Sequence, residues 1–343
     1  MFFKRARRGL LLDLNPFQML AAGVAVWDEQ PYELDCAQEF AAGDFDGLSR
    51  WLKSNLDVKP WLPAYVTFYP GERLMQRDTI QPRKLGESGY LQKFAEEQCK
   101  ISRPAEWSLH AISPHEGTTY TTEGAQRPAL LCGAPHSLLR KQQQQLLELG
   151  IVPHRLEIGT LPVIAALMEN QTRKNDKRAL VLVEIEQERT HVYILGKEGV
   201  HTTSPIPHGL AALEATARKE FGLAETDSPR ERLATEDDEL LLRAPKLLRP
   251  LARDLKPLLD SYEMTTGQPI GEIHCSHLPD AYRWMAATLA QGAGRAVFDL
   301  NVPQWLIQVQ IKTGELPPFP LNWLGLLSLV ADLTPPKTDA KSA

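Results

Sequence analysis

The spacing of apolar positions changes repeatedly along this chain between the period typical of strands and the period typical of helices. Apolar runs bounded by turn residues predict strands at residues 9–14, 17–26, 64–71, 106–114, 118–124, 127–135 and 152–159. Helical spacing predicts helices at residues 39–56, 84–99, 136–150 and 160–171. Ser88 is expected to cap the second helix, Gly150 to end the third, and Pro162 to lie in the first turn of the fourth. Such alternation is typical of an α/β unit.

The alternation restarts after a polar segment at residues 172–178, which is expected to link two halves. In the second half, the pattern predicts a hairpin at 182–195, a helix after Gly209 and a helical region at 228–264. Pro245, Pro250 and Pro257 are expected to interrupt the helical region. A strand at 271–279, a helix at 280–291 and a strand at 295–301 are predicted to follow. The apolar residues 321–333 are fewer than the roughly 20 that a membrane span needs. They predict a buried helix.

Both halves open in the same way. When Asp13 is aligned with Glu184, the run LLLDLN falls on VLVEIE, and each half begins with an apolar strand, an acidic residue, a turn and a second strand. Helical units follow in both halves. This faint duplication predicts two similar α/β lobes that face one another across a cleft, which is a natural place for a ligand.

Composition and charge limit the classes of function and the cell compartment that fit the chain. The 343 residues suffice for two lobes, and a net charge of −5 gives no general attraction to nucleic acid. Four scattered cysteines without a CxxC pair fit buried thiols in a reducing compartment. Only four apolar residues follow the basic arm, fewer than the roughly 7–15 of an export signal. We expect a cytoplasmic protein whose arm rests on an anionic membrane surface or stays a solvated terminus; the arm consists of Lys4, Arg5, Arg7 and Arg8.

Three blocks carry a family resemblance: MFFKRARRGLLLDLN at the start, ALLCGAPHSLLRKQQQQLLELGIVPHRLEIGTLPVIAAL in the middle and LNWLGLLSLVADL near the end. Their order and spacing resemble the PilM family of type IV pilus assembly and, more loosely, FtsA and the cytoplasmic actin-like domains of type II secretion. The resemblance implies an actin-like (RNase H-like, duplicated) two-lobed α/β fold with a small inserted subdomain at about residues 62–125. The first lobe would span residues 1–171 and the second 172–334, with a disordered tail at 335–343.

The resemblance also implies a nucleotide site for ATP and Mg²⁺ in the cleft. The positions that match it are Asp13, Asn15, Glu184, Glu186, Thr190 and His277. Each loop departs from the family pattern where small residues or glycines are expected: Asn15 and Pro16 stand in the first, Glu186 in the second and His277 in the third. Glycine lets phosphates reach main-chain N–H groups, and the carboxylates of Glu186 and Glu188 would repel a polyphosphate.

We therefore expect weak or lost nucleotide binding, no required cofactor and no enzymatic activity. One alternative is an ATP-dependent switch of the same fold, in which Asp13 and Glu184 hold a hydrated Mg²⁺. A sugar-kinase-like catalyst is a third hypothesis, which the missing glycines disfavour. The run HCSH suggests a metal site, but His274 and His277 would point to opposite faces of a strand, and no metal is expected.

Aromatic residues gather around the predicted inserted subdomain, namely Tyr65, Phe68, Tyr90 and Phe94. The simplest interpretation is that they form the subdomain's own core. In the PilM family, however, the groove between this subdomain and the first lobe holds the N-terminal peptide of the membrane protein PilN. The resemblance thus implies a scaffold, peripheral to the inner membrane, that docks a PilN-like peptide and contacts a cytoplasmic ring or motor protein of a pilus or secretion machine. No nucleic acid partner is expected.

Overall fold

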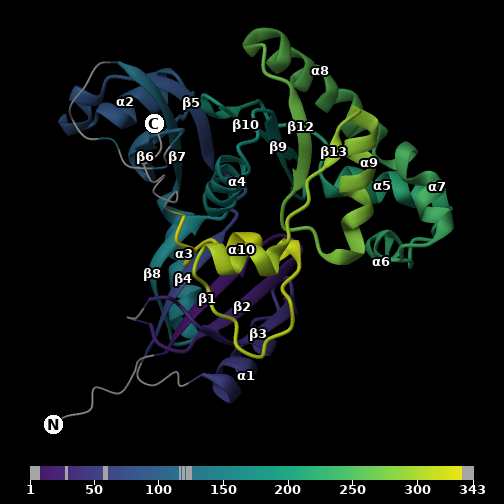
Figure 1. Cartoon of the computed structure of the whole chain (residues 1–343), viewed down its shortest axis with the longest axis horizontal. Helices are drawn as coiled ribbons and strands as arrows, with labels where there is room; N and C mark the ends of the chain where they lie inside the picture. The colour runs from purple at the N-terminus through teal and green to yellow at the C-terminus, as the bar shows by residue number, and fades with distance from the viewer. Residues whose placement is uncertain are drawn as a thin grey trace, which may run out of the picture.

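The computed structural model describes residues 8–27, 30–56, 61–115, 117, 120 and 126–333. These residues form two five-stranded sheets and one three-stranded sheet (Figure 1). The first sheet has the order β3-β2-β1-β4-β8, with β3 at Leu34–Ala41, β2 at Gln18–Val24, β1 at Gly9–Leu14, β4 at Leu62–Phe68 and β8 at Ile151–Ile158. The second has the order β11-β10-β9-β12-β13, with β11 at Gly199–Thr202, β10 at Thr190–Gly196, β9 at Ala179–Ile185, β12 at Ile270–Cys275 and β13 at Ala296–Val297.

The two five-stranded sheets repeat one topology. In the first, β1 pairs antiparallel with β2 and parallel with β4. In the second, β9 pairs antiparallel with β10 and parallel with β12. The outer strands repeat the same directions, since β3 and β11 pair antiparallel and β8 and β13 pair parallel with their neighbours. The duplication inferred from the alignment of Asp13 with Glu184 is therefore confirmed at the level of strand order.

Helices cover the outer face of each sheet, and a shared layer lies between the sheets. The first sheet carries α1 (Phe45–Asn55) and α3 (His136–Glu148) on its outer side. The second carries α5 (Leu210–Phe221), α6 (Pro229–Ala234), α7 (Asp238–Leu247), α8 (Arg249–Thr266) and α9 (Arg283–Ala293). The shared layer contains α4 (Thr160–Lys174), α10 (Val302–Gln308) and α11 (Leu324–Leu327), and α4 lies centrally in Figure 1. Short 3₁₀ turns occupy Pro82–Gly86, Pro104–Glu106, Asp280–Tyr282 and Leu321–Trp323.

Strand alternation decides which residues face the shared layer. In β1, Leu12 packs into the outer core with α1, whereas Leu11 packs into the core of the shared layer. In β9, Leu182 also packs into that shared core. Because side chains alternate between the faces of a strand, Asp13 and Glu184, each two residues further along, point to the same inner side. The two sheets thus aim their acidic residues toward one another.

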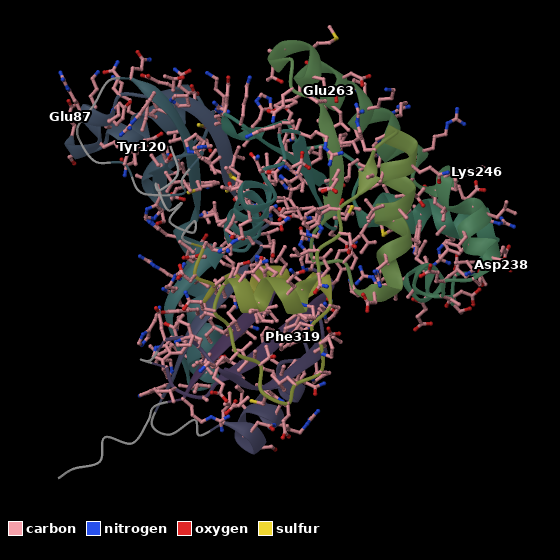
Figure 2. The ribbon with its side chains drawn as sticks, in the orientation of Figure 1. Glu87, Tyr120, Asp238, Lys246, Glu263 and Phe319 are labelled. Carbon is pink, nitrogen blue, oxygen red and sulfur yellow. The ribbon has the colours of Figure 1, made fainter. Side chains whose placement is uncertain are left out.

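The third sheet is the inserted subdomain, which the structure places at residues 74–135. It has the order β5-β7-β6, with β5 at Leu74–Ile80, β7 at Arg127–Pro135 and β6 at Trp107–Ile112. Helix α2 (Tyr90–Glu97) covers it. The predicted range of about 62–125 is corrected at both ends, because β4 pairs within the first sheet and β7 within the third. Figure 2 shows Glu87 on this subdomain and Lys246 at the far end of the second lobe.

Several element predictions need correction. Gly89, with φ of 80°, and not Ser88, precedes α2. The predicted linker at 172–178 is partly helical, because α4 continues to Lys174 before Asn175 adopts a left-handed conformation that ends it. The predicted helix at 321–333 is only a 3₁₀ turn and the single turn α11, although residues 323–330 are buried as expected.

The prolines of the helical region act differently from the prediction. Pro250 lies in the first turn of α8, where its missing N–H costs nothing, and Pro245 and Pro257 lie inside α7 and α8 without ending them. The strands β3, β5 and β11 were not predicted. Of the predicted strand at 118–124 the structure describes only Tyr120, which is in no strand; most of the basic arm and the predicted tail at 335–343 lie outside the described residues.

The chain returns to the first sheet after β13. Trp305 of α10 and Leu324 of α11 are buried together with Leu11 and Leu20 of the first sheet. Residues 302–330 therefore share a core with the first sheet, although the sequence prediction places them in the second lobe; the boundary at 171 stays a prediction. Among the helices that the structure describes, none is long and apolar enough to cross a membrane.

Candidate functional site

Asp13 lies at the end of β1 and is almost fully buried. Its carboxylate accepts hydrogen bonds from the hydroxyl of Thr67, its register partner on β4, and from Asn15 Nδ2 at 2.9 Å. Burial raises the pKa of Asp13 to about 6, and the hydrogen bonds from Thr67 and Asn15 act in the opposite direction. Asp13 is thus an acid held by neutral donors in a dry environment.

Glu184 occupies the equivalent position at the end of β9 and has no exposed surface. Its Oε2 accepts from Thr160 Oγ1 at 2.8 Å, and its Oε1 accepts from Ser276 Oγ at 3.3 Å. Ser276 follows β12 and donates its N–H to Val183, so it stands beside Glu184 as Thr67 stands beside Asp13. Burial raises the pKa of Glu184, with the positive charge of Arg73 opposing it.

Arg73 supplies the cation of the site. It directly precedes β5 of the inserted subdomain, and its side chain is fully buried. Arg73 Nη2 donates to Glu184 Oε2 at 2.8 Å, while Nη1 donates to Glu186 Oε1. His191 Nε2 lies 3.4 Å from Glu186 Oε2. Burial alone would raise the pKa of Glu186, but His191 and Arg73 outweigh it, and the pKa is lowered.

The backbone amides of the two strand turns are used within the chain. Asn15 Oδ1 accepts from the N–H groups of Phe17 and Gln18, at 3.0 Å and 2.9 Å. At the start of α5, the N–H of Leu210 donates to the carbonyl of Glu186 at 2.7 Å, and the next amide donates to residue 187 at 2.9 Å. A side chain at Gly209 would meet the carbonyl of Glu186, so the turn and helix are in close contact.

Aromatic rings close the remaining side of the site. His277 has a φ of 46°, and its ring lies 5.9 Å from that of Phe17 and 4.8 Å from that of Tyr69. Burial lowers the pKa of His277 to about 3, so it is neutral at physiological pH. His274 instead packs on Phe298, with ring centroids 5.2 Å apart. In the part of the chain that the structure describes, no group of three His, Cys, Asp or Glu side chains could hold a metal ion.

All six residues predicted for the nucleotide site are buried. Five of them gather around Arg73 and Tyr69, namely Asp13, Asn15, Glu184, Glu186 and His277. Thr190 does not join them: its Oγ1 donates to the carbonyl of His208 at 2.6 Å, which fastens the segment before α5. The prediction that the carboxylates of Glu186 and Glu188 would repel a polyphosphate stays a prediction; Arg73 binds Glu186, and Glu188 is exposed.

Sequence reasoning missed the residues that hold these acids, namely Thr67, Tyr69, Arg73, Thr160 and Ser276. Arg73 contacts Glu184 across 111 positions of sequence, and no local pattern signals such a contact. Thr67 and Ser276 follow from the parallel pairing of the central strands, which only the register reveals.

A cavity of about 1040 Å³ lies between the inserted subdomain and the first lobe. One wall is formed by β6 and β7, through Ser108, His110, Ile112, Leu130, Cys132 and Ala134. The opposite walls come from β8, α3 and α4, through His154, Arg155, Glu157, Leu139, Leu161, Ala165 and Met168. Both β6 and β8 are edge strands of their sheets. The cavity is thus bounded by apolar side chains, a few charged groups and two strand edges.

The four aromatic residues predicted for the groove are not brought together. Phe68 lines the cavity. Tyr65 packs on Trp27, with ring centroids 4.5 Å apart. Tyr90 and Phe94 pack on each other, and Phe94 packs against the core of the inserted subdomain, in line with the simpler interpretation. The signal that would have located the cavity is the polar alternation of β6, whose Ser108, His110 and Ile112 share one face.

No protein-family model and no curated protein matches the chain. Among solved structures, the chain is similar to a chain of the PilM–PilN type IV pilus biogenesis complex, with a TM-score of 0.65 and 14% identity over 94% of this chain and 97% of that one. A protein of Bacteroides thetaiotaomicron with an actin-like ATPase fold gives a TM-score of 0.47 at 8% identity, covering 96% and 98%. The cytoplasmic domain of EpsL, from the type II secretion system of Vibrio cholerae, gives 0.36 at 12%, covering 64% and 79%.

The likeness to the pilus complex extends over nearly the whole of both chains and shows a shared fold. Together with the repeated sheet topology, it confirms the predicted actin-like, two-lobed α/β fold with an inserted subdomain. At 14% identity the likeness concerns the fold alone, so the activity must be argued from the site.

Proposed function

We propose that the protein is a cytoplasmic scaffold, peripheral to the inner membrane, of a type IV pilus or related secretion platform. It would dock the N-terminal segment of a PilN-like membrane protein and contact a cytoplasmic ring or motor protein. The similarity to a chain of the PilM–PilN complex supports this placement. The observation that carries the docking function is the cavity between the inserted subdomain and the first lobe.

The cavity suits a short peptide in an extended conformation. Its volume of about 1040 Å³ is slightly above the range of about 300–1,000 Å³ typical of ligand sites. Among the described strands, none pairs with the outer edges of β6 and β8, so an extended segment can add there as a further strand. The apolar side chains of Leu161 and Met168 on α4 can take the apolar residues of such a segment, while Arg155 and Glu157 offer charged contacts at its rim.

Mg²⁺ and a nucleotide do not fit the cleft residues, and we propose that nucleotide binding is weak or lost and that the protein is not an enzyme. The acid on β9 that would take Mg²⁺ already binds Arg73, and Asp13 is held by Thr67 and Asn15. The amides of Phe17 and Leu210, which would approach phosphates, already have acceptors. On this proposal, the guanidinium of Arg73 takes the place of a metal ion beside Glu184.

Titration calorimetry tests the peptide site. We expect a synthetic peptide of the N-terminal cytoplasmic residues of the PilN-like protein encoded beside this gene to bind the full chain. Leu139→Glu, which places a charge in the cavity wall, should weaken binding at least about tenfold, because burying an unpaired carboxylate is costly. Leu147→Glu is the matched control: it lies on the same helix, is 45% exposed and does not line the cavity. Absence of binding, or equal loss in both variants, would contradict the docking site.

The nucleotide prediction has its own measurement. Titration of the full chain with ATP and Mg²⁺ should give no binding in the low micromolar range, because the carboxylates of Asp13 and Glu184 and the amides of the two strand turns are already engaged within the chain. A clear micromolar isotherm would reject this part of the proposal and favour the alternative, in which the protein is an ATP-dependent switch.

A further inference from the structure

The inserted subdomain contacts the second lobe through the edge of β5, which lies beside β11. The N–H of Arg77 on β5 donates to Thr202 Oγ1 at 2.9 Å. From the other side, the N–H of Val200 donates to the carbonyl of Pro114 at 2.9 Å. A Cβ at Gly199, whose φ is 85°, would lie 2.3 Å from that carbonyl, so the close approach requires glycine. These contacts define a junction between β5 and β11.

Arg73 stands at the base of the same junction, directly before β5. Its two terminal nitrogens bind two different carboxylates of the second lobe, Glu184 and Glu186, and its side chain is fully buried. A planar guanidinium can bind two carboxylates at once, which a lysine ammonium cannot do with the same geometry. The ion pair joins two parts of the fold that are distant in sequence, the inserted subdomain and the second lobe.

The charges of the second lobe make this cation necessary to the closed arrangement. Glu184 of β9 and Glu186, just after β9, are both buried and bind the same guanidinium, and Asp13 adds a third acid from the first sheet. Buried like charges repel one another strongly in a dry environment. Removing the cation would leave uncompensated buried carboxylates, and the least costly response is to let water enter by separating the junction.

We propose that Arg73 is an internal latch, which holds the inserted subdomain closed against the second lobe through Glu184 and Glu186, so that closure of the cleft is built into the chain. In this arrangement the chain itself supplies the positive charge that joins the lobes, and closure does not depend on a bound ligand. The latch goes beyond the docking function and stands whether or not a peptide occupies the cavity, which Pro114 and Val200 of the junction also line.

Hydrogen–deuterium exchange on the full chain without ligand tests the latch. The amides of Arg77 and Val200 cross the junction and serve as reporters. In Arg73→Met we expect both amides to exchange at least about tenfold faster, because the junction opens locally. Amides between β6 and β7, which belong to the inserted sheet itself, should keep their protection. Protected Arg77 and Val200 amides in the folded variant would overturn the proposal.

Controls separate a latch from a general loss of stability. Arg103→Met removes an exposed ion pair with Glu106 on the same subdomain and should leave the junction amides unchanged. If Arg73→Met does not fold, Arg73→Lys and Glu186→Gln test the latch instead. Each keeps part of the ion pair, so the Arg77 and Val200 amides should exchange faster than in the wild type, but by less than about tenfold. Unchanged exchange in both would also overturn the latch. Because no peptide or nucleotide is added, this result is independent of the docking test.

Discussion

Two acids at equivalent positions of a duplicated strand have different partners. Asp13 is held by the neutral donors Thr67 and Asn15, whereas Glu184 also receives a guanidinium from Arg73. Burial raises the pKa of both, but only for Glu184 does a full positive charge oppose the shift. The first acid can therefore be neutralised by a proton near physiological pH, and the second is neutralised by the chain itself.

This difference predicts how stability depends on pH. The pKa of Asp13 is about 6 in the folded protein and near 3.8 when unfolded, so the folded state binds the proton more tightly. The resulting contribution to the free energy of unfolding is fully present below about pH 4 and is lost as the pH rises through 6. Because the two pKa values differ by about two units, this contribution is about 3 kcal/mol. Asp13→Asn removes this contribution. Urea unfolding should show the wild type losing about 3 kcal/mol relative to the variant between pH 4 and 7.

His277 provides a control for the comparison of the wild type with Asp13→Asn. His277 has a pKa lowered to about 3, so its contribution rises with pH up to about 6.5, and His277→Gln should shift the pH profile in the opposite sense. A difference between wild type and Asp13→Asn that stays constant with pH would show that Asp13 titrates normally.

At the scale of elements, the turns of the two matching hairpins are built differently. The turn after β1 is organised by Asn15, whose side-chain oxygen binds two backbone amides while its Nδ2 binds Asp13. The turn after β9 instead anchors α5 through the carbonyls of Glu186 and its neighbour. In both turns, backbone groups that would otherwise face a ligand bind within the chain and position the next element.

The elements show what sequence could and could not provide. Hairpins, most helices and the duplication follow from period and turn residues, because local sterics and burial leave a regular trace. Strand β5 leaves no such trace. Its sequence LMQRDTI mixes polar and apolar residues without a regular period, and its pairing strand lies far away in sequence. Asp13 and Glu184 were located from the repeated strand pattern, whereas Arg73 was missed because its role depends on a contact between distant segments.

The Asn15 turn gives a prediction at this scale. Asn15→Ala removes one acceptor for two amides and one donor for Asp13, all nearly buried, so we expect a loss of about 1–3 kcal/mol in the free energy of unfolding. Glu188→Ala alters the equivalent exposed turn after β9 and should change the free energy by less than about 0.5 kcal/mol. Equal effects in urea unfolding would show that the side-chain bonds of Asn15 do not organise the turn.

At the scale of the whole molecule, the two lobes share one core. Leu11 of the first sheet and Leu182 of the second pack into the same cluster, together with α4 and the returning C-terminal segment. Trp305 of α10 is buried at its centre, and its Nε1 donates to Glu169 Oε2 of α4 at 3.2 Å. Phe319 lies further along the same segment, beside the first sheet (Figure 2). A lobe cut from the chain by sequence position would lose part of this core.

Shared packing predicts that the lobes lose stability together. Trp305→Ala empties a large buried site and removes one hydrogen-bond donor to Glu169, so we expect a loss of about 3–5 kcal/mol in the free energy of unfolding. Ile307→Ala on the same helix is the matched control, because Ile307 is 78% exposed and its removal should cost less than about 0.5 kcal/mol. Hydrogen exchange should show Trp305→Ala weakening the protection of β1 and of β9 to a similar degree, since both strands face the shared layer. Weakened protection confined to β1 would mean that α10 belongs to the first lobe alone and that the two sheets unfold separately.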